Sequence, residues 1–342
     1  MIRSFSELVG NTPLIRLNKL SDSSGCEIFG KAEFLNPGNS VKDRAALSII
    51  SEAIASGVLT ESGTIVEGTA GNTGIGLTLI GASMGFQTIT VIPETQTQEK
   101  KDTLKNVGAR LIEVPAVPYS NPNNYIRYSE RLAKELNSTL PGGAFWANQF
   151  DNLANQNAHV NTTAPEIYAQ TEGKVDAFIC SVGTGGTLSG VSKGLRVLKP
   201  KVKIALVDPF GSALYNYFTE GELRSEGSSI SEGIGQGRIT RNLQGLAVDA
   251  SFRASDDEAL NSIYDLLYNE GVSVGLSSGI NMVGAFKLAQ TLDKGSTIVT
   301  ILCDHGMRYQ SKIFNYEFLK KSALPIPPWM KNNEINIPNV MQ

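Results

Sequence analysis

A single lysine stands where a nucleophilic amine could act. The segment NPGNSVKDR (36–44) joins a turn-forming cluster to the start of a predicted helix. We expect Ser40 to be the N-cap, which places Lys42 in the first helical turn, at the positive end of the helix dipole. An ammonium group is disfavoured there, and the neutral amine is the form that attacks a carbonyl carbon to make an imine. The same spacing also fits a solvated surface lysine.

Two glycine-rich turns could bind the anionic groups of a ligand. The segment EGTAGNTG (67–74) follows a predicted strand and opens a predicted helix, so its N–H groups suit a carboxylate or phosphate. Thr69, Asn72 and Thr73 add side-chain donors. The segment SVGTGGT (181–187) lies at the carboxyl end of another strand, the edge at which parallel sheets bind ligands. The turn at residues 67–74 could instead have only a structural role. The turn at residues 181–187 indicates that an anionic group is bound, but it does not identify the cofactor.

Other segments carry weaker signals. EGIGQG (232–237) and GLSSG (275–279) could line the same cleft, although plain loops are the default interpretation. A nicotinamide-dependent oxidoreductase is a second hypothesis, but Leu188 stands where the last glycine of a dinucleotide fingerprint would be. Three distant cysteines and two histidines have neither zinc-site nor disulfide spacing, so no metal is predicted.

The elements that must position these segments alternate along almost the whole chain. Short β-rich runs followed by helical periodicity predict an α/β fold, with mostly parallel sheets covered by helices on both faces. Strands are predicted at residues 27–33, 64–67, 88–92, 110–114, 177–182, 203–207 and 297–303. Helices are predicted at residues 41–56, 98–106, 125–136, 256–269 and 281–292, followed by an extended tail at residues 324–342.

The composition argues against several classes of protein. The chain has 342 residues, which suggests roughly two domains. Charged residues make up 18% and the net charge is −3, without a basic run, so nucleic-acid binding is not expected. No apolar stretch approaches the ~20 residues of a membrane span, and no secretory signal opens the sequence. We therefore expect a cytoplasmic protein with reduced thiols.

Taken together and in order, these segments resemble the pyridoxal-phosphate enzymes of the tryptophan-synthase-β fold type, and within it the cysteine synthase (O-acetylserine sulfhydrylase) and cystathionine β-synthase family. The resemblance runs from NTPLIRL (11–17) to GMRY (306–309). It implies two three-layer α/β/α domains, with pyridoxal 5′-phosphate in the cleft between them (fold type II). The larger, cofactor-binding domain would comprise residues 1–46 and 153–323. The smaller, mobile domain, residues 47–152, would bind the substrate carboxylate.

The resemblance also implies roles for individual residues. Lys42 would hold the cofactor as an internal Schiff base and act as the catalytic base, with Asn72 on the ring hydroxyl and Ser277 opposite the pyridine nitrogen. The phosphate would be bound by Gly183, Thr184, Gly185, Gly186 and Thr187. The substrate would be bound by Thr69, Gly71, Asn72, Thr73, Gln149 and Gly235. Because serine is neutral, Ser277 would leave the ring nitrogen unprotonated, which favours elimination over transamination.

The implied reaction is a β-replacement on an O-activated serine. O-acetylserine and sulfide would give L-cysteine and acetate through an α-aminoacrylate intermediate. A cystathionine β-synthase-like or O-phosphoserine-using enzyme stays open, because Ala70 replaces a usual serine, Arg238 adds a cation, and ILCDHG (301–306) replaces the more usual stretch that contains Pro and Ser. The lack of a haem-binding extension and of a regulatory domain weighs against a full cystathionine β-synthase.

The resemblance extends to assembly. It implies a homodimer, and a serine acetyltransferase could insert its C-terminal peptide into the cleft as a partner. A non-catalytic relative that keeps the fold as a binding protein is a third hypothesis. A scaffold would have no use for Lys42, Asn72 and Ser277, which argues against it.

Overall fold

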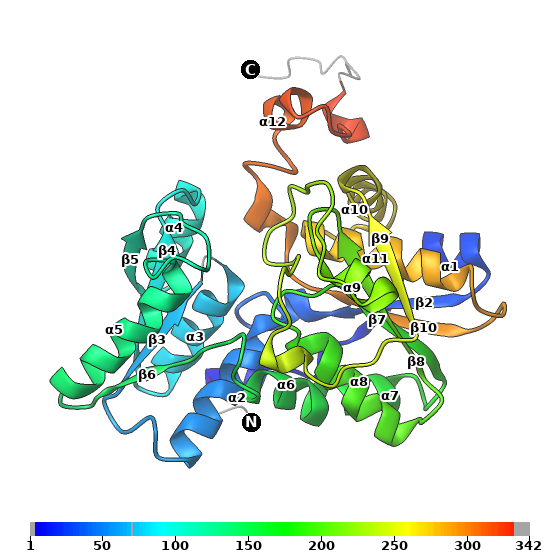
Figure 1. The fold of residues 1–342 in the computed structure, drawn as a ribbon. Coiled ribbons are helices and arrows are strands. Elements are labelled where there is room, and N and C mark those ends of the chain that lie inside the picture. The colour runs from blue at the N-terminus through cyan, green and yellow to red at the C-terminus, as the bar shows by residue number, and fades with distance from the viewer. Residues whose placement is uncertain (1–3, 70, 332–342) are drawn as a thin grey trace, which may run out of the picture.

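Two sheets form the frame of the molecule. The computed structural model describes residues 4–69 and 71–331, and Figure 1 shows the two sheets side by side. The larger sheet has the order β1-β2-β10-β7-β8-β9, in which only β1 runs antiparallel to its neighbour. The smaller sheet has the order β5-β4-β3-β6 and is parallel throughout.

The predicted strands are all present, and three short or edge strands were not predicted. The larger sheet contains β1 (Leu14–Arg16), β2 (Glu27–Ala32), β7 (Val175–Cys180), β8 (Lys203–Pro209), β9 (Ala250–Ala254) and β10 (Thr297–Leu302). The smaller sheet contains β3 (Thr64–Gly68), β4 (Gln87–Pro93), β5 (Arg110–Val114) and β6 (Ala144–Trp146). Strand β7 ends earlier than predicted, because the Ser181 N–H donates to Asn281 Oδ1 (2.7 Å) instead of to a strand.

Helices cover both faces of each sheet. They are α1 (Asn18–Ser24), α2 (Lys42–Ala55), α3 (Asn72–Ser83), α4 (Gln98–Asn106), α5 (Tyr125–Thr139), α6 (Ala154–Ala158), α7 (Ala164–Gln170), α8 (Gly186–Leu198), α9 (Leu214–Glu220), α10 (Asp256–Glu270), α11 (Leu276–Ala289) and α12 (Tyr316–Lys321). No helix among residues 4–69 and 71–331 combines the length and the apolar character that crossing a bilayer requires.

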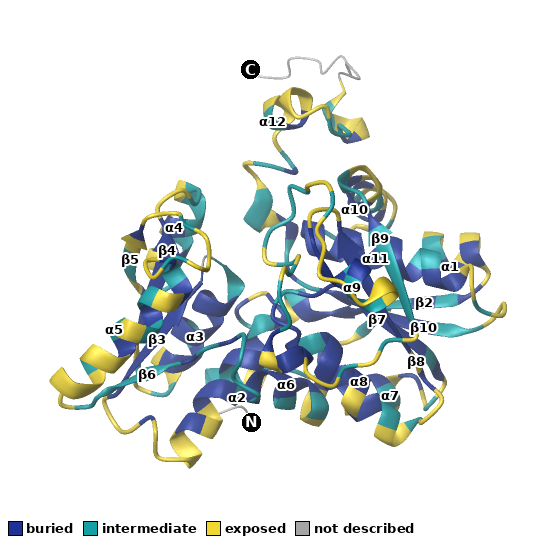
Figure 2. Ribbon diagram, in the orientation of Figure 1, coloured by how far each residue is buried: buried dark blue, intermediate teal, exposed yellow. Residues whose placement is uncertain are grey.

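Apolar layers on both sides of each sheet fix this arrangement. Helices α10 and α11 pack on one face of the larger sheet, and α7 and α8 pack on the other. Helices α2 and α3 cover one face of the smaller sheet, and α5 covers the opposite face. Figure 2 shows the strands and the inward helix faces buried. Strands buried on both faces need the continuous apolar runs seen in the sequence, and the α/β class with parallel sheets is therefore confirmed. The domain boundaries stay a prediction.

Two local predictions are wrong. Val41, not Ser40, is the N-cap of α2, because the Ser40 backbone pairs with Asp304 and the Val41 N–H donates to the Cys303 carbonyl (2.8 Å). The segment 275–279 is largely the first turn of α11 rather than a loop. Its Gly279 packs so closely on α10 that a Cβ would lie 2.5 Å from the Ala259 carbonyl oxygen.

The described part of the C-terminal segment packs on the protein. Trp329 stacks on Tyr268 at a ring-centroid distance of 6.1 Å and meets Tyr264 edge-on at 5.8 Å. Both tyrosines belong to α10. Residues 324–327 have no regular secondary structure, as expected of an extended tail, but residues 328–330 form a short turn that packs on α10. Residues 332–342 lie outside the described residues.

Candidate active site

A cavity of about 760 Å³ between the two sheets brings the predicted segments together. Its walls come from the carboxyl ends of β3, β7 and β10 and from the first turns of α2, α3, α8 and α11. Strand ends and helix N-termini expose backbone N–H groups, which favour a ligand with anionic groups. Every predicted site residue lines this cavity except Gly186. Ala70, which stands where the resemblance leads one to expect a serine, lies outside the described residues.

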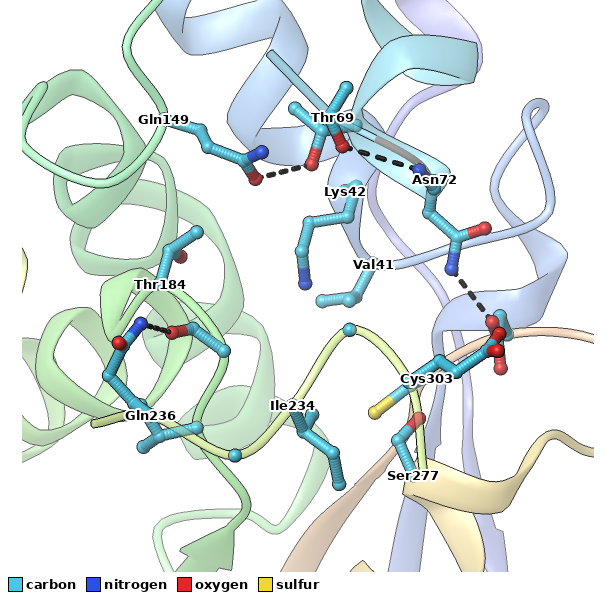
Figure 3. Close-up of a pocket in the computed structure, with 18 of the residues that line it drawn as sticks. Val41, Lys42, Thr69, Asn72, Gln149, Thr184, Ile234, Gln236, Ser277 and Cys303 are labelled. Carbon is cyan, nitrogen blue, oxygen red and sulfur yellow. Dashed lines mark hydrogen bonds between the residues drawn. The ribbon is translucent and has the colours of Figure 1, made fainter. Parts of the chain in front are cut away.

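Lys42 is the first residue of α2, and its side chain reaches into the middle of the cavity (Figure 3). Three other cations line the cavity, and each has partners. Lys100 is paired with Glu232, Arg238 with Asp151 (3.1 Å), and Arg308 donates to Asn72 and Gly38. Within residues 4–69 and 71–331, the Lys42 amine has no hydrogen bond or ion pair of its own. A free amine at this place can react with a ligand.

The turn between β7 and α8 offers a set of backbone donors. Gly185 has φ 92°, in the left-handed region that favours glycine, and it caps the 13-residue helix α8. None of the N–H groups of Gly183, Thr184, Gly185 and Thr187 has an acceptor in the described part of the chain. Unsatisfied donors at a helix N-terminus are suited to a phosphate, so this donor set fits the predicted phosphate cup. Gly186 instead donates weakly to Thr184 Oγ1 (3.4 Å).

Thr184 is held from two sides by neighbouring side chains. Asn155 Nδ2 donates to its hydroxyl oxygen (2.8 Å), and the Thr240 hydroxyl donates to its carbonyl oxygen (2.7 Å). Both bonds are buried. A hydroxyl that already accepts a bond directs its own hydrogen elsewhere, so Thr184 is prepared to donate into the cavity.

The opposite end of the cavity carries Ser277 and Cys303. Ser277 lies in the first turn of α11, and Figure 3 shows it next to Cys303 at the end of β10. Burial and the neighbouring Asp304 carboxyl raise the pKa of the Cys303 thiol to about 11, against the effect of the Ser277 hydroxyl. Near neutral pH this wall therefore presents a neutral thiol and a neutral hydroxyl.

The β3–α3 turn faces the cavity with hydroxyls and amides. The Thr73 hydroxyl donates to Gln149 Oε1 (2.6 Å), and the Gly71 N–H donates to Thr69 Oγ1 (3.3 Å). The Gln149 carbonyl is in turn fixed by the side chains of Asn155 (2.8 Å) and Asn242 (3.0 Å). These bonds orient the turn. They occupy the Thr73 hydroxyl hydrogen and the Gly71 N–H, which a bound carboxylate would have to take over as the acceptor, whereas the hydrogen of the Thr69 hydroxyl is used by neither bond.

The loop containing Gly235 closes over the phosphate side. Gly235 has φ 87°, and its N–H donates to the Val182 carbonyl (2.9 Å). Gln236 Nε2 donates to the Gly183 carbonyl (2.9 Å). The loop and the β7–α8 turn are so close that a Cβ on Gly183 would lie 2.2 Å from the Gly233 carbonyl oxygen. The cleft-lining interpretation of residues 232–237 is therefore confirmed.

Several polar residues of the site were not predicted. Asn155, His159, Asp304 and Arg308 contact predicted site residues or line the cavity. No short motif signals them, since their partners lie between 28 and 236 positions away in the chain. As to metals, residues 4–69 and 71–331 contain no cluster of three or more His, Cys, Asp or Glu side chains suited to an ion.

Comparisons with known proteins identify the family of the chain. A sequence model of the family described as "Pyridoxal-phosphate dependent enzyme" matches residues 5–304. Cysteine synthase 1 of Neurospora crassa is 50% identical over 321 residues, covering 92% of this chain and 84% of that protein. Cysteine synthase 1 of Emericella nidulans is 48% identical and covers 94% of this chain and 87% of that protein.

A solved structure extends the match to the whole fold. The O-acetylserine-dependent cystathionine β-synthase from Helicobacter pylori has a TM-score of 0.80 and 33% identity, covering 91% of this chain and 98% of that one. The sequence matches and the structural match therefore both indicate a pyridoxal-phosphate-dependent enzyme. Neither supports the hypothesis of a nicotinamide-dependent oxidoreductase. The chain belongs to the pyridoxal-phosphate-dependent enzymes, in the family of the cysteine synthases and their cystathionine β-synthase relatives.

Proposed function

We propose that the protein replaces the acetoxy group of O-acetyl-L-serine by sulfide, giving L-cysteine and acetate. The Cβ–O bond breaks, a Cβ–S bond forms, and the Cα proton is removed and then returned. The observation that carries the proposal is the unpaired Lys42 amine, which shares one cavity with the open N–H donors of Gly183, Thr184, Gly185 and Thr187. The high identity to two fungal cysteine synthases supports it.

The residues present fit pyridoxal phosphate. Lys42 would hold its aldehyde carbon, the N–H groups of Gly183, Thr184, Gly185 and Thr187 would bind its phosphate, and Ser277 would face its ring nitrogen. Asn72 would bind the ring oxygen. When bound, the cofactor supplies an electron sink that makes the Cα proton acidic.

Side chains and backbone groups of the protein would bind the substrate, transfer the proton and exclude water. The β3–α3 turn, with Thr69, Gly71 and Thr73, would bind the substrate carboxylate together with Gln149, so that the Cα–H bond is held in place. Lys42 Nζ would accept the Cα proton and later return it, as a general base within reach of the bound substrate. The loop that contains Gly235 lines one wall of the cavity and would help to exclude water from the reacting centre.

A direct assay tests the proposal. Protein loaded with pyridoxal phosphate is mixed with O-acetyl-L-serine and sulfide, and L-cysteine is measured. We expect turnover in the wild type, its loss by at least about 10²-fold in K42A, and normal turnover in the matched surface variant K174A. Absence of cysteine formation with a correctly loaded wild type would refute the proposal.

The second candidate reaction uses another leaving group or acceptor. Arg238 lies at the cavity with its guanidinium over the rings of Tyr119 (5.0 Å) and Phe150 (5.5 Å), and the H. pylori relative is a cystathionine β-synthase. A panel of O-acetylserine, O-phosphoserine and serine against sulfide and homocysteine separates the two. Preference for homocysteine would assign the chain to the second reaction.

The proposal also covers the oligomeric state of the protein, its location in the cell and its protein partner. We propose a homodimer, located in the cytoplasm, with a serine acetyltransferase as a further partner. Sedimentation at several protein concentrations measures the oligomeric state, and a titration with an acetyltransferase C-terminal peptide measures the partner interaction.

A further inference from the structure

Asn72 is held at both ends of its amide by residues that follow β10. Arg308 Nη1 donates to Asn72 Oδ1, and Arg308 Nη2 donates to the carbonyl oxygen of Gly38, in the loop before Lys42. At the other end, Asn72 Nδ2 donates to Asp304 Oδ2 (2.7 Å). Figure 3 shows Asn72 with its amide nitrogen directed along this second bond.

The chemistry of the two partners fixes the orientation of the amide. A guanidinium has five N–H donors and no acceptor, so Arg308 can face only the amide oxygen. Asp304 Oδ2 already accepts the hydroxyl of Tyr309 (2.6 Å) and accepts the amide N–H as well. A flipped Asn72 would place its N–H groups against the guanidinium and its oxygen against the carboxyl oxygen. Both hydrogen bonds would then be lost.

This orientation decides what Asn72 offers the cavity. Arg308 takes one of the two lone pairs of the amide oxygen, and Figure 3 shows this oxygen on the side of Asn72 that faces away from Lys42, whereas Nδ2 uses one of its two hydrogens for Asp304. The second N–H remains, and Asn72 lines the cavity. A ligand oxygen at this place therefore meets a donor and must act as an acceptor.

We propose that Arg308 is a positioning residue. It fixes the Asn72 amide so that Asn72 presents only a hydrogen-bond donor to the ligand. The inference rests on the proposed function: if the cofactor's ring oxygen lies at Asn72, the donor stabilises that oxygen in its ionised form. Arg308 would then set the ionisation of a group that it does not touch.

Absorption spectra of the loaded protein test this role. Protonation of the ring oxygen shifts absorbance of bound cofactor from the visible to the near-ultraviolet. We expect the visible band to dominate in the wild type and in R241M, an arginine variant at an exposed position outside the cavity. In R308M we expect the near-ultraviolet band to grow several-fold and the cofactor Kd to rise about tenfold, as for a lost charge-assisted bond. R308K, which keeps a donor-only group, should restore most of the visible band.

A double variant separates positioning from a structural effect. If Arg308 acts through Asn72, R308M should change the spectrum in the wild-type background but not in N72A. An R308M change of equal size in both backgrounds, or no change in folded R308M, overturns the inference. Should R308M not fold, R308Q takes its place with the same expectation, because its amide can present either atom to Asn72. A wild type that binds no pyridoxal phosphate overturns the proposed function as well, whereas a loaded wild type with an unchanged R308M spectrum overturns the inference alone.

Discussion

The Nε2 atom of His159 lies 3.1 Å from the hydroxyl oxygen of Thr187, in the turn predicted to bind phosphate. The Nδ1 atom of the same ring lies 2.9 Å from the hydroxyl oxygen of Thr163. Burial, together with the positive charges of Arg44 and Lys42, holds the pKa of His159 well below its usual value. The ring is therefore neutral, with one nitrogen that donates and one that accepts. If Nε2 donates, the Thr187 hydroxyl is free to donate into the cavity.

This relationship predicts the effect of replacing His159. H159L removes the neutral hydrogen bond that orients the Thr187 hydroxyl and should weaken binding of pyridoxal phosphate about fivefold, as expected for one neutral hydrogen bond of about 1 kcal/mol. H159Q can place an amide near the same hydroxyl and should recover most of the affinity. Cofactor titrations followed by absorbance give both values. Equal affinities for H159L and the wild type would contradict the prediction.

Glu67 predicts an unusual dependence of stability on pH. It lies in β3, fully enclosed, near Gln149, Asn148 and Tyr125, and its Oε2 has no hydrogen-bond partner among the described residues. Burial raises its pKa to about 8 from 4.5. The folded protein thus keeps this proton over a pH range in which the unfolded chain releases it. Stability should fall as pH rises from about 4.5 to about 8.

The measurement compares E67Q with the wild type. The amide keeps the shape and removes the titration, so the free energy of unfolding of the wild type should drop relative to E67Q by on the order of 2 kcal/mol between pH 5.5 and pH 7.5. Urea unfolding at the two pH values measures this difference. E61Q, at an exposed position, serves as the control and should run parallel to the wild type. If the difference in free energy of unfolding between wild type and E67Q were the same at both pH values, Glu67 would be ionised in the folded state.

Local signals in the sequence were enough to predict most strands of the two sheets and the turns that face the cavity. A buried strand, a glycine-rich turn and a helix start form one continuous segment, so residues 67–74 and 181–187 could be placed at sheet edges without knowledge of the rest. Strands β1 and β6 have only three residues, too few for a periodic pattern. Their pairing with longer strands decides that they are strands.

The supporting side chains could not be found in this way. Arg308 meets Asn72 across 236 positions, and Asn155 meets Thr184 across 29. A lone histidine such as His159 is indistinguishable from any other buried polar residue until its partners are in place. The start of α2 was misplaced by one residue for the same reason, because the Val41 N–H finds its acceptor at Cys303. Long-range contacts, not local preference, decide these positions.

Gly183 and Gly237 allow a matched test of the close contact between the β7–α8 turn and the loop of residues 232–237. Neither Gly183 nor Gly237 has a positive φ, so alanine is compatible with both backbones. At Gly183 a Cβ would lie 2.2 Å from the Gly233 carbonyl oxygen, whereas at Gly237 nothing lies within 4 Å. G183A should therefore displace the 232–237 loop and lower cofactor affinity by about tenfold or more. G237A should bind as the wild type does, and similar titration curves for both variants would contradict the role of the contact.

Glu232 connects the two sides of the cavity mouth. Its carboxylate is paired with Lys100 of α4, beside the smaller sheet, and with Lys312 (2.5 Å), which follows the larger sheet. Although burial opposes it, the two lysines lower the pKa of Glu232 below its usual value, so the group is charged at neutral pH. E232Q keeps the shape and removes that charge.

Loss of this bridge should weaken closure of the cavity around the substrate. Partly exposed ion pairs contribute up to about 1 kcal/mol, so E232Q should raise the KM for the serine substrate about fivefold with little change in kcat. Because salt screens such pairs, raising the ionic strength should increase the KM of the wild type and leave that of E232Q almost unchanged. E222Q, at an exposed position away from the cavity, should keep the wild-type values and salt response. An identical salt response in wild type and E232Q would show that the bridge does not hold the mouth closed.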